Sequence, residues 1–286
     1  MKVLVLGSSG QLARHLRSRM PEATFWGRDT VSVADTENLE RQILQFAPAA
    51  IINAAAYTAV DRAETDAALA WKINAEATAA AARAAAILGA VLIHVSTDYV
   101  FDGESHDPYS PDSPTRPTNV YGKTKLAGEL AAATLCHRHW ILRSSWVFSE
   151  FDGNFVTTML RLGAERGSIR VVDDQYGRPT YAGHLAEAMI RLISEPRGLA
   201  WGIHHAVGGP VVTWYGFAQR IFQEAKALGV VTEAPEVLPI PTSQFPTAAK
   251  RPLRAVLAPS RELQHPTNSD MDWRQGLQNA LIGATR

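Results

Sequence analysis

Short apolar runs alternate with amphipathic helical patterns through the first half of the chain. This alternation is typical of parallel strands that are buried on both faces and connected by helices. It therefore predicts a doubly wound α/β domain with helices on both sides of a parallel sheet. The predicted strands are 3–6, 23–26, 50–53, 91–95 and 141–143, and the predicted helices are 11–20, 37–46, a long stretch through residue 86 and one beginning near residue 121.

The pattern changes after about Glu150. Prolines, glycines and aromatic residues become denser there, as in QYGRPTY and VGGPVVTWYGF. We expect residues 150–286 to form mainly a smaller α/β substrate-binding region, which closes over the carboxyl edge of the sheet. Near the end of the chain, Trp273, Leu277 and Leu281 share one helical stripe, which core packing explains.

Composition excludes several classes of protein. Of 286 residues, 46% are apolar and 20% are charged, which is typical of a folded soluble domain. The 28 basic residues equal the 28 acidic ones, so no overall field attracts nucleic acid or an anionic membrane. Glu76 and Arg83 interrupt the alanine-rich stretch, which favours a buried helix over a membrane span. The single cysteine, Cys136, fits a reducing compartment, and we expect a cytoplasmic protein.

A glycine turn follows the first predicted strand in VLVLGSSGQLA. Gly7 and Gly10 let backbone amides approach a pyrophosphate at the N-terminus of the next helix, although any tight turn of this kind can use glycine. Ala13 stands at the third glycine position, where a small side chain permits close packing of helix and strand. Because the turn is the first in the sheet, we predict that residues 1–149, with return segments from the later chain, form mainly a dinucleotide-binding Rossmann domain.

Two further stretches bear on the cofactor. The second strand ends in FWGRD, where Arg28 can meet a 2′-phosphate and Asp29 a ribose hydroxyl. We therefore predict NADPH, with NADH as the alternative, although a solvated Arg–Asp turn explains the same residues. The three alanines at 54–56 follow a buried strand and leave room for a flat cofactor, or simply pack a helix.

Candidate chemistry lies in VSTDYVFDG and NVYGKTKLAGE. The first places hydroxyl groups of Ser96 and Thr97 at the end of a strand, where such groups also commonly satisfy the backbone. The second places Tyr121 and Lys125 one helical turn apart on the same face. A surface pair is the simpler explanation of this spacing alone, and Lys123 falls on a different face.

Together these stretches resemble the extended short-chain dehydrogenase/reductases, most closely the branch that reduces dTDP-linked 4-keto-deoxyhexoses. The matching stretches run in family order to about Trp273: GSSGQLA, NAAAYTAVDRAE, VSTDYVFDG, NVYGKTKLAGE, LRSSWVF, GNFVTTMLRL, DDQYGRPTYAGHLA and KRP. STDYVFDG followed by VYGKTKLAGE is specific to this branch. Two positions depart from it: Ala13, and Ser32, where the family has an acidic residue that contacts adenine.

The resemblance implies hydride transfer from NAD(P)H to the C4 ketone of dTDP-4-dehydro-L-rhamnose, which yields dTDP-L-rhamnose. Tyr121 would donate the proton, and Lys125 would lower the pKa of the phenol and hold the nicotinamide ribose. Thr97 would hydrogen-bond the substrate oxygen or the tyrosine. Besides this catalytic set, the expected cofactor contacts are Gly7, Ser9, Gly10, Gln11, Leu12, Arg28, Ala54, Ala55, Ala56, Tyr121 and Lys125.

Substrate contacts also follow from the resemblance, with arginines suited to the diphosphate. Core packing is the alternative for Trp146, and a solvated surface position is the alternative for Arg251. His204 and His205 lie in an apolar run and are expected to be packed or hydrogen-bonded, and no metal-ligand spacing is found. The expected substrate contacts are Thr97, Asp98, Tyr99, Tyr121, Trp146, Asn154, Phe155, Arg178 and Arg251.

Two other functions remain open at this point. A nucleotide-sugar epimerase on the same scaffold would retain oxidised NAD and consume no reductant. A regulatory subunit of a methionine adenosyltransferase would use the fold to bind NADP and a partner without catalysis, although the intact Thr–Tyr–Lys set argues against it. We expect a nucleotide-sugar substrate and neither nucleic acid nor membrane as partner, and a homodimer stays open.

Overall fold

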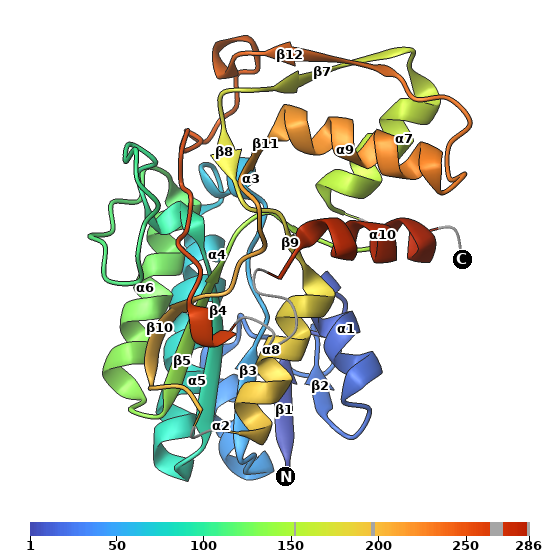
Figure 1. The fold of residues 1–286 in the computed structure, drawn as a ribbon. Coiled ribbons are helices and arrows are strands. Elements are labelled where there is room, and N and C mark those ends of the chain that lie inside the picture. The colour runs from blue at the N-terminus through green and yellow to red at the C-terminus, as the bar shows by residue number, and fades with distance from the viewer. Residues whose placement is uncertain (152, 196–197, 264–270, 285–286) are drawn as a thin grey trace.

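A parallel sheet of six strands forms the lower part of the molecule (Figure 1). The computed structural model describes residues 1–151, 153–195, 198–263 and 271–284. The strand order is β2-β1-β3-β4-β5-β10, so the order reverses between β1 and β3, where ligands bind in sheets of this type. The strands are β1 (Val3–Leu6), β2 (Thr24–Trp26), β3 (Ala50–Asn53), β4 (Val91–Thr97), β5 (His139–Ser144) and β10 (Gly202–His205).

Helices cover both faces of this sheet, as the sequence predicts. Along β1, Val3 and Val5 face one core and Leu4 and Leu6 face the other, because successive side chains of a strand point in opposite directions. Helices α1 (Gln11–Arg19) and α8 (Ala182–Ser194) pack on the first face, and α2 (Thr36–Phe46), α5 (Ala77–Leu88) and α6 (Val120–Leu135) pack on the second.

The long helical stretch before β4 contains a wider turn. Asn74 lies in a π-helical segment, Lys72–Glu76, between α4 (Ala67–Trp71) and α5. Its side chain accepts a hydrogen bond from the backbone of Tyr57 and donates one to Thr124 on α6. The short α3 (Val60–Ala63) precedes this stretch. The wider turn therefore ties the loop after β3 to the helix that carries Tyr121.

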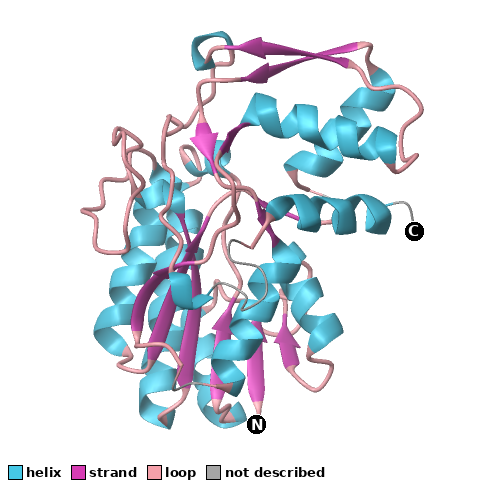
Figure 2. Cartoon of the chain, viewed as in Figure 1, coloured by secondary structure: helices cyan, strands magenta, loops and turns pink. Residues whose placement is uncertain are grey.

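The second region lies above the carboxyl edge of the sheet (Figure 2). Its core joins three helices to a parallel pair of strands. The predicted stripe of Trp273, Leu277 and Leu281 is confirmed, since all three side chains are buried in this core. The elements are α7 (Phe155–Glu165), β7 (Ser168–Val172), α9 (Trp214–Ala227), β12 (Glu236–Ile240) and α10 (Trp273–Ala284).

Very short strands connect the two regions. β6 (Val147–Phe148) pairs with β9 (Thr180–Tyr181), and β8 (Tyr176–Gly177) pairs with β11 (Val212–Thr213). α8 and β10 return to the main sheet although they follow residue 150, in keeping with the return segments expected. The division of the chain at that residue stays an interpretation. Among the described residues, no helix is both long and apolar enough to cross a membrane.

Candidate active site

A cavity of about 760 Å³ lies at the carboxyl ends of β1, β3, β4 and β5, within the size range of small-molecule sites. Most of the residues expected to contact cofactor or substrate line it, and Gly7, Arg28 and Arg178 do not. The expected residues that do line it are Ser9, Gly10, Gln11, Leu12, Ala54, Ala55, Ala56, Thr97, Asp98, Tyr99, Tyr121, Lys125, Trp146, Asn154, Phe155 and Arg251.

Ser9 and Gly10, in the turn after β1, line the cavity. Gly7 has φ of +104°, and a Cβ atom there would lie 3.3 Å from the backbone nitrogen of Ala55. Gly10 caps α1 without a side-chain hydrogen bond, so the first N–H groups of the helix have no side-chain acceptor. An anionic pyrophosphate fits such a helix N-terminus. The hydroxyls of Ser96 and Ser144 also line the cavity, and both are buried without a hydrogen-bond partner in the described chain.

Three residues expected to contact the cofactor or the substrate do not line this cavity: Arg28, Asp29 and Arg178. Arg28 and Asp29 are exposed at the end of β2. Arg178 donates from Nη1 to the carbonyl of Gly208 at 3.2 Å. Their roles toward a 2′-phosphate, a ribose and a diphosphate stay predictions.

The expected catalytic set of Thr97, Tyr121 and Lys125 comes from β4 and α6. Asn119 begins α6 by accepting the backbone N–H of Gly122, which places Tyr121 in the first turn. Burial raises the pKa of the Tyr121 phenol, and a hydrogen bond with Thr97 partly opposes the rise. The expected lowering of this pKa by Lys125 is wrong.

The position of the Lys125 ammonium gives the physical reason. Nζ donates to the carbonyl of Val95 on β4 at 2.6 Å, and the residue is 2% exposed. Burial lowers the pKa of Lys125 to about 8, against the opposing charge of Glu129. The amine therefore lies against the strand, where it lines the cavity floor. Lys123 is exposed, as predicted.

Asp98 is the buried acid of the site. Thr97 donates its hydroxyl to Oδ1 at 3.0 Å, and Asp98 is 3% exposed. Burial raises the pKa of the Asp98 carboxyl to about 7, and the hydrogen bonds from Thr97 and from the backbone of Asp98 and Tyr99 hold it from rising further.

Arg251 and Tyr99 form one wall. Arg251 donates from Nη1 to the Tyr99 hydroxyl at 2.8 Å and from Nη2 to Asp61 at 2.5 Å. The Tyr99 ring meets the Tyr121 ring edge-on at 5.5 Å. The guanidinium is therefore held in place at the cavity, and the solvated-surface alternative for Arg251 is wrong.

Aromatic side chains of the second region form another wall. Trp146 has φ of +48°, unusual for a residue with a side chain, and stacks on Trp214 at 3.5 Å. Phe155 lies against Trp214 at 4.5 Å. Trp146 thus lines the cavity in addition to packing. An adjoining cavity of about 400 Å³ shares Tyr99, Phe155, Trp214 and Arg251 with the first, so these residues lie between the two.

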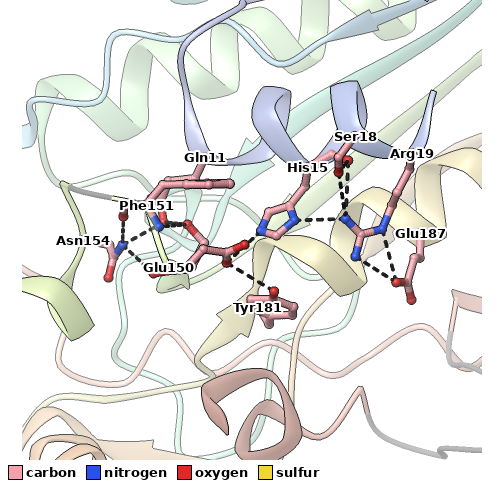
Figure 3. Close-up of polar contacts among 10 residues, drawn as sticks. Gln11, His15, Ser18, Arg19, Glu150, Phe151, Asn154, Tyr181 and Glu187 are labelled. Carbon is pink, nitrogen blue, oxygen red and sulfur yellow. Dashed lines mark hydrogen bonds and ion pairs between the residues drawn. The ribbon is translucent and has the colours of Figure 1, made fainter. Parts of the chain in front are cut away.

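Gln11 links the glycine turn to the second region (Figure 3). Its Oε1 accepts from the Ser149 hydroxyl at 2.8 Å and from Asn154 Nδ2 at 3.0 Å. Asn154 also caps α7, accepting the backbone N–H groups of Val156 and Thr157. The Asn154 amide therefore holds the start of α7 and bonds Gln11, and its expected contact with a diphosphate stays a prediction.

Sequence reasoning missed Trp214 and read two histidines correctly. TWYGF offers aromatic density as its only signal, and the stacking partner lies far along the chain. His205 is buried, bonds the carbonyl of Ala258 at 3.0 Å, and has its pKa lowered to about 3 by burial. His204 bonds the carbonyl of Ala200. In the described part of the chain, no group of three His, Cys, Asp or Glu side chains could hold a metal ion.

The doubly wound sheet and the Thr97–Tyr121–Lys125 set are those of a short-chain dehydrogenase/reductase. The family model described as RmlD substrate binding domain matches residues 1–285, and the chain belongs to that family. This confirms the branch that the sequence motifs indicate.

Relatives and solved structures support the same family assignment. A dTDP-4-dehydrorhamnose reductase of Aggregatibacter actinomycetemcomitans is 39% identical over 97% of each chain. One of Salmonella typhimurium is 40% identical over 88% of this chain and 87% of its own. The crystal structure of a dTDP-4-dehydrorhamnose reductase of Bacillus anthracis in complex with NADP is 33% identical, covers 99% of both chains and has a TM-score of 0.90. A Thermus thermophilus UDP-glucose 4-epimerase, 20% identical over 100% of this chain and 99% of its own with a TM-score of 0.80, shares the fold.

Proposed function

We propose that this protein is an NADPH-dependent oxidoreductase that reduces the C4 ketone of dTDP-4-dehydro-L-rhamnose to give dTDP-L-rhamnose. The observation that carries the proposal is the convergence of Thr97, Tyr121 and Lys125 on one cavity beside an uncapped helix N-terminus. Relatives at 37–40% identity that are named dTDP-4-dehydrorhamnose reductase support the substrate. The NADP complex of the Bacillus anthracis protein supports the cofactor.

The nicotinamide cofactor supplies the hydride when it is bound. The Tyr121 phenol donates its proton to the alkoxide that develops at C4, and Thr97 orients this proton transfer. Lys125 contributes an ammonium group in the cavity floor, which suits the ribose hydroxyls. Its charge also stabilises the negative charge that develops in the transition state.

The cavity geometry supports a place for the nucleotide. Arg251 presents a guanidinium between the two cavities, where it suits a diphosphate. The adjoining cavity, with its apolar side chains Met159, Leu162 and Phe245, suits the base. The sugar then lies between Trp146 and the Tyr121 phenol. The roles of Asn154 and Arg178 toward the diphosphate remain part of this proposal.

A spectrophotometric assay tests the function. Enzymatically generated dTDP-4-dehydro-L-rhamnose is supplied with NADPH or with NADH, and nicotinamide absorbance is followed. Net oxidation of the cofactor with formation of dTDP-L-rhamnose supports the reductase. Interconversion of sugars without cofactor consumption would favour the epimerase, whose likeness at 20% identity concerns the fold alone. Absence of turnover, with stoichiometric capture of a methionine adenosyltransferase, would favour the regulatory subunit.

The single cysteine and the nucleotide-sugar chemistry support a cytoplasmic location, where thiols stay reduced. Neutral overall charge supports small-molecule partners over nucleic acid. A homodimer remains open, and sedimentation of the purified protein decides it.

A further inference from the structure

The Arg251 guanidinium, which lines both cavities, is held by an acid from another element. Nη2 donates to Oδ2 of Asp61 on α3 at 2.5 Å, and Nη1 donates to the Tyr99 hydroxyl at 2.8 Å. A guanidinium has five N–H groups, so these two bonds leave three that can donate to a ligand. The diphosphate contact proposed for Arg251 does not explain why a carboxylate lies beside it.

The same carboxylate also holds the main chain that leads into Arg251. Oδ1 of Asp61 accepts the backbone N–H of Ala249 at 3.0 Å. From the other side, Asn119 donates from Nδ2 to the carbonyl of Lys250 at 2.9 Å. Asn119 is the residue that caps α6, the helix with the proposed proton donor. The segment that carries the arginine is therefore fixed both to α3 and to the start of the catalytic helix.

Asp61 has two opposing effects on an anionic ligand. Its negative charge repels the ligand, whereas its bonds fix the plane of the Arg251 fork. The Asp61 side chain is 45% exposed and that of Arg251 is 21% exposed, so solvent screens much of the repulsion. Orientation is not screened, because paired bonds to phosphate oxygens require the planar fork in one place. We therefore expect orientation to outweigh repulsion.

We propose that Asp61 is a positioning residue, which orients the Arg251 guanidinium toward the diphosphate of the nucleotide sugar. Without the carboxylate, the arginine side chain would have to be ordered when the ligand binds, and that ordering costs affinity. Asp61 makes and breaks no bond of the reaction, so its effect is expected in KM and not in kcat. This inference rests on the proposed function, because it takes the diphosphate of that substrate as the ligand.

Two probes that differ by the diphosphate test the inference. Calorimetric titration of the NADPH-loaded protein measures the Kd for dTDP and for thymidine. Asp61→Asn removes the charge at nearly constant size, and it should raise the Kd for dTDP about tenfold and that for thymidine less than about twofold. With dTDP-4-dehydro-L-rhamnose, KM should rise about tenfold while kcat changes less than about threefold.

Three further variants serve as controls. Asp272 lies outside both cavities and accepts the backbone N–H and the guanidinium of Arg274, so Asp272→Asn should keep the wild-type Kd for dTDP. Asp61→Glu keeps the charge but moves the carboxylate by one methylene, so it should raise this Kd at least about threefold. In Arg251→Lys, which lacks the planar fork, a second substitution Asp61→Asn should cost less than about twofold.

Several outcomes would overturn the inference. Tighter binding of dTDP by Asp61→Asn would show that repulsion outweighs orientation. Equal losses of affinity for dTDP and thymidine, or additive effects of the Asp61 and Arg251 substitutions, would show that Asp61 does not act through the guanidinium. If Asp61→Asn does not fold, an unchanged Kd for dTDP in Asp61→Glu would overturn the inference alone. The expected loss of dTDP affinity without any wild-type oxidation of NADPH would support the role of Asp61 and contradict the proposed reductase function.

Discussion

Lys125 donates from Nζ to the carbonyl of Val95 at 2.6 Å, so its ammonium lies against β4. The spacing of four residues does place both side chains on one face of α6. Their long side chains nevertheless end at different partners. Burial lowers the pKa of Lys125, and burial raises the pKa of Tyr121.

Replacement of Lys125 by Met should reduce kcat by roughly 10²-fold while the protein stays folded. Because burial lowers the pKa of Lys125, its charge destabilises the folded state at neutral pH, and its removal offsets the lost bond to Val95. Urea denaturation is expected to give a free energy of unfolding within about 1 kcal/mol of wild type, or higher. The exposed Lys123→Met should leave both quantities unchanged. Marked destabilisation of Lys125→Met would contradict this account.

Replacement of Tyr121 by Phe removes the phenol proton and leaves the ring. We expect kcat to fall by about 10²–10⁴, the usual contribution of general acid catalysis. Cofactor affinity, measured by fluorescence titration with NADPH, should change by less than about threefold. Tyr215→Phe, outside the lining of both cavities, is the matched control. Near-normal turnover by Tyr121→Phe would rule out its role as the proton donor.

The pH dependence of stability should also report on Asp98. Its folded-state pKa of about 7 lies above the ordinary value of 3.8, so the folded protein binds the proton more tightly. The stabilising effect of that proton is complete below about pH 4 and is lost as the pH rises through about 7. Asp98→Asn should therefore gain stability relative to wild type between about pH 4 and about pH 8, on the order of 2–4 kcal/mol. Urea denaturation at both pH values measures this, and a pH-independent difference would refute it.

The buried pair of Arg143 and Glu129 joins β5 to α6 below the site. It is bidentate, with distances of 2.9 and 2.7 Å, and both side chains are 2% exposed. Glu129→Ala leaves the guanidinium uncompensated and should lower the free energy of unfolding by about 3–5 kcal/mol. Glu165→Ala removes the exposed partner of Arg161 and should cost less than about 1 kcal/mol. Equal effects of the two variants would contradict the prediction.

Trp214→Leu tests the aromatic wall. Loss of the stack on Trp146 should loosen the substrate site and raise KM for the nucleotide sugar by about tenfold, with kcat changed less than about threefold. Steady-state kinetics at saturating NADPH measures both constants. Trp71→Leu, a half-exposed tryptophan on α4, is the control and should keep the wild-type KM. A change in kcat alone would show that Trp214 acts elsewhere.

The main sheet could be predicted from the sequence because its strands are buried on both faces. β1 and β3 match their predicted bounds, and β4 extends two residues further, to Thr97. β6, β8, β9 and β11 have two residues each, too few for any periodicity. Their pairing depends on segments that are distant along the chain, so they required the structure.

The site was predicted in part for similar reasons. Strand and helix ends alone left Thr97, Tyr121 and Lys125 ambiguous, and the family resemblance singled them out. The structure brings all three to one cavity. The direction of the Lys125 amine and the stacking of Trp214 depend on neighbours from other elements. Motifs place residues at a site, but they do not say which of several acceptors a long side chain selects.

Gln11 accepts hydrogen bonds from Ser149 and Asn154, and Glu150 lies 3.3 Å from the buried His15 of α1 (Figure 3). Separation of the two regions would remove these partners, at about 1–3 kcal/mol for each buried group. Helix α1 therefore helps to stabilise the second region as well as the sheet. Heating should consequently melt both regions in one cooperative transition, and limited proteolysis should not release either as a stable fragment.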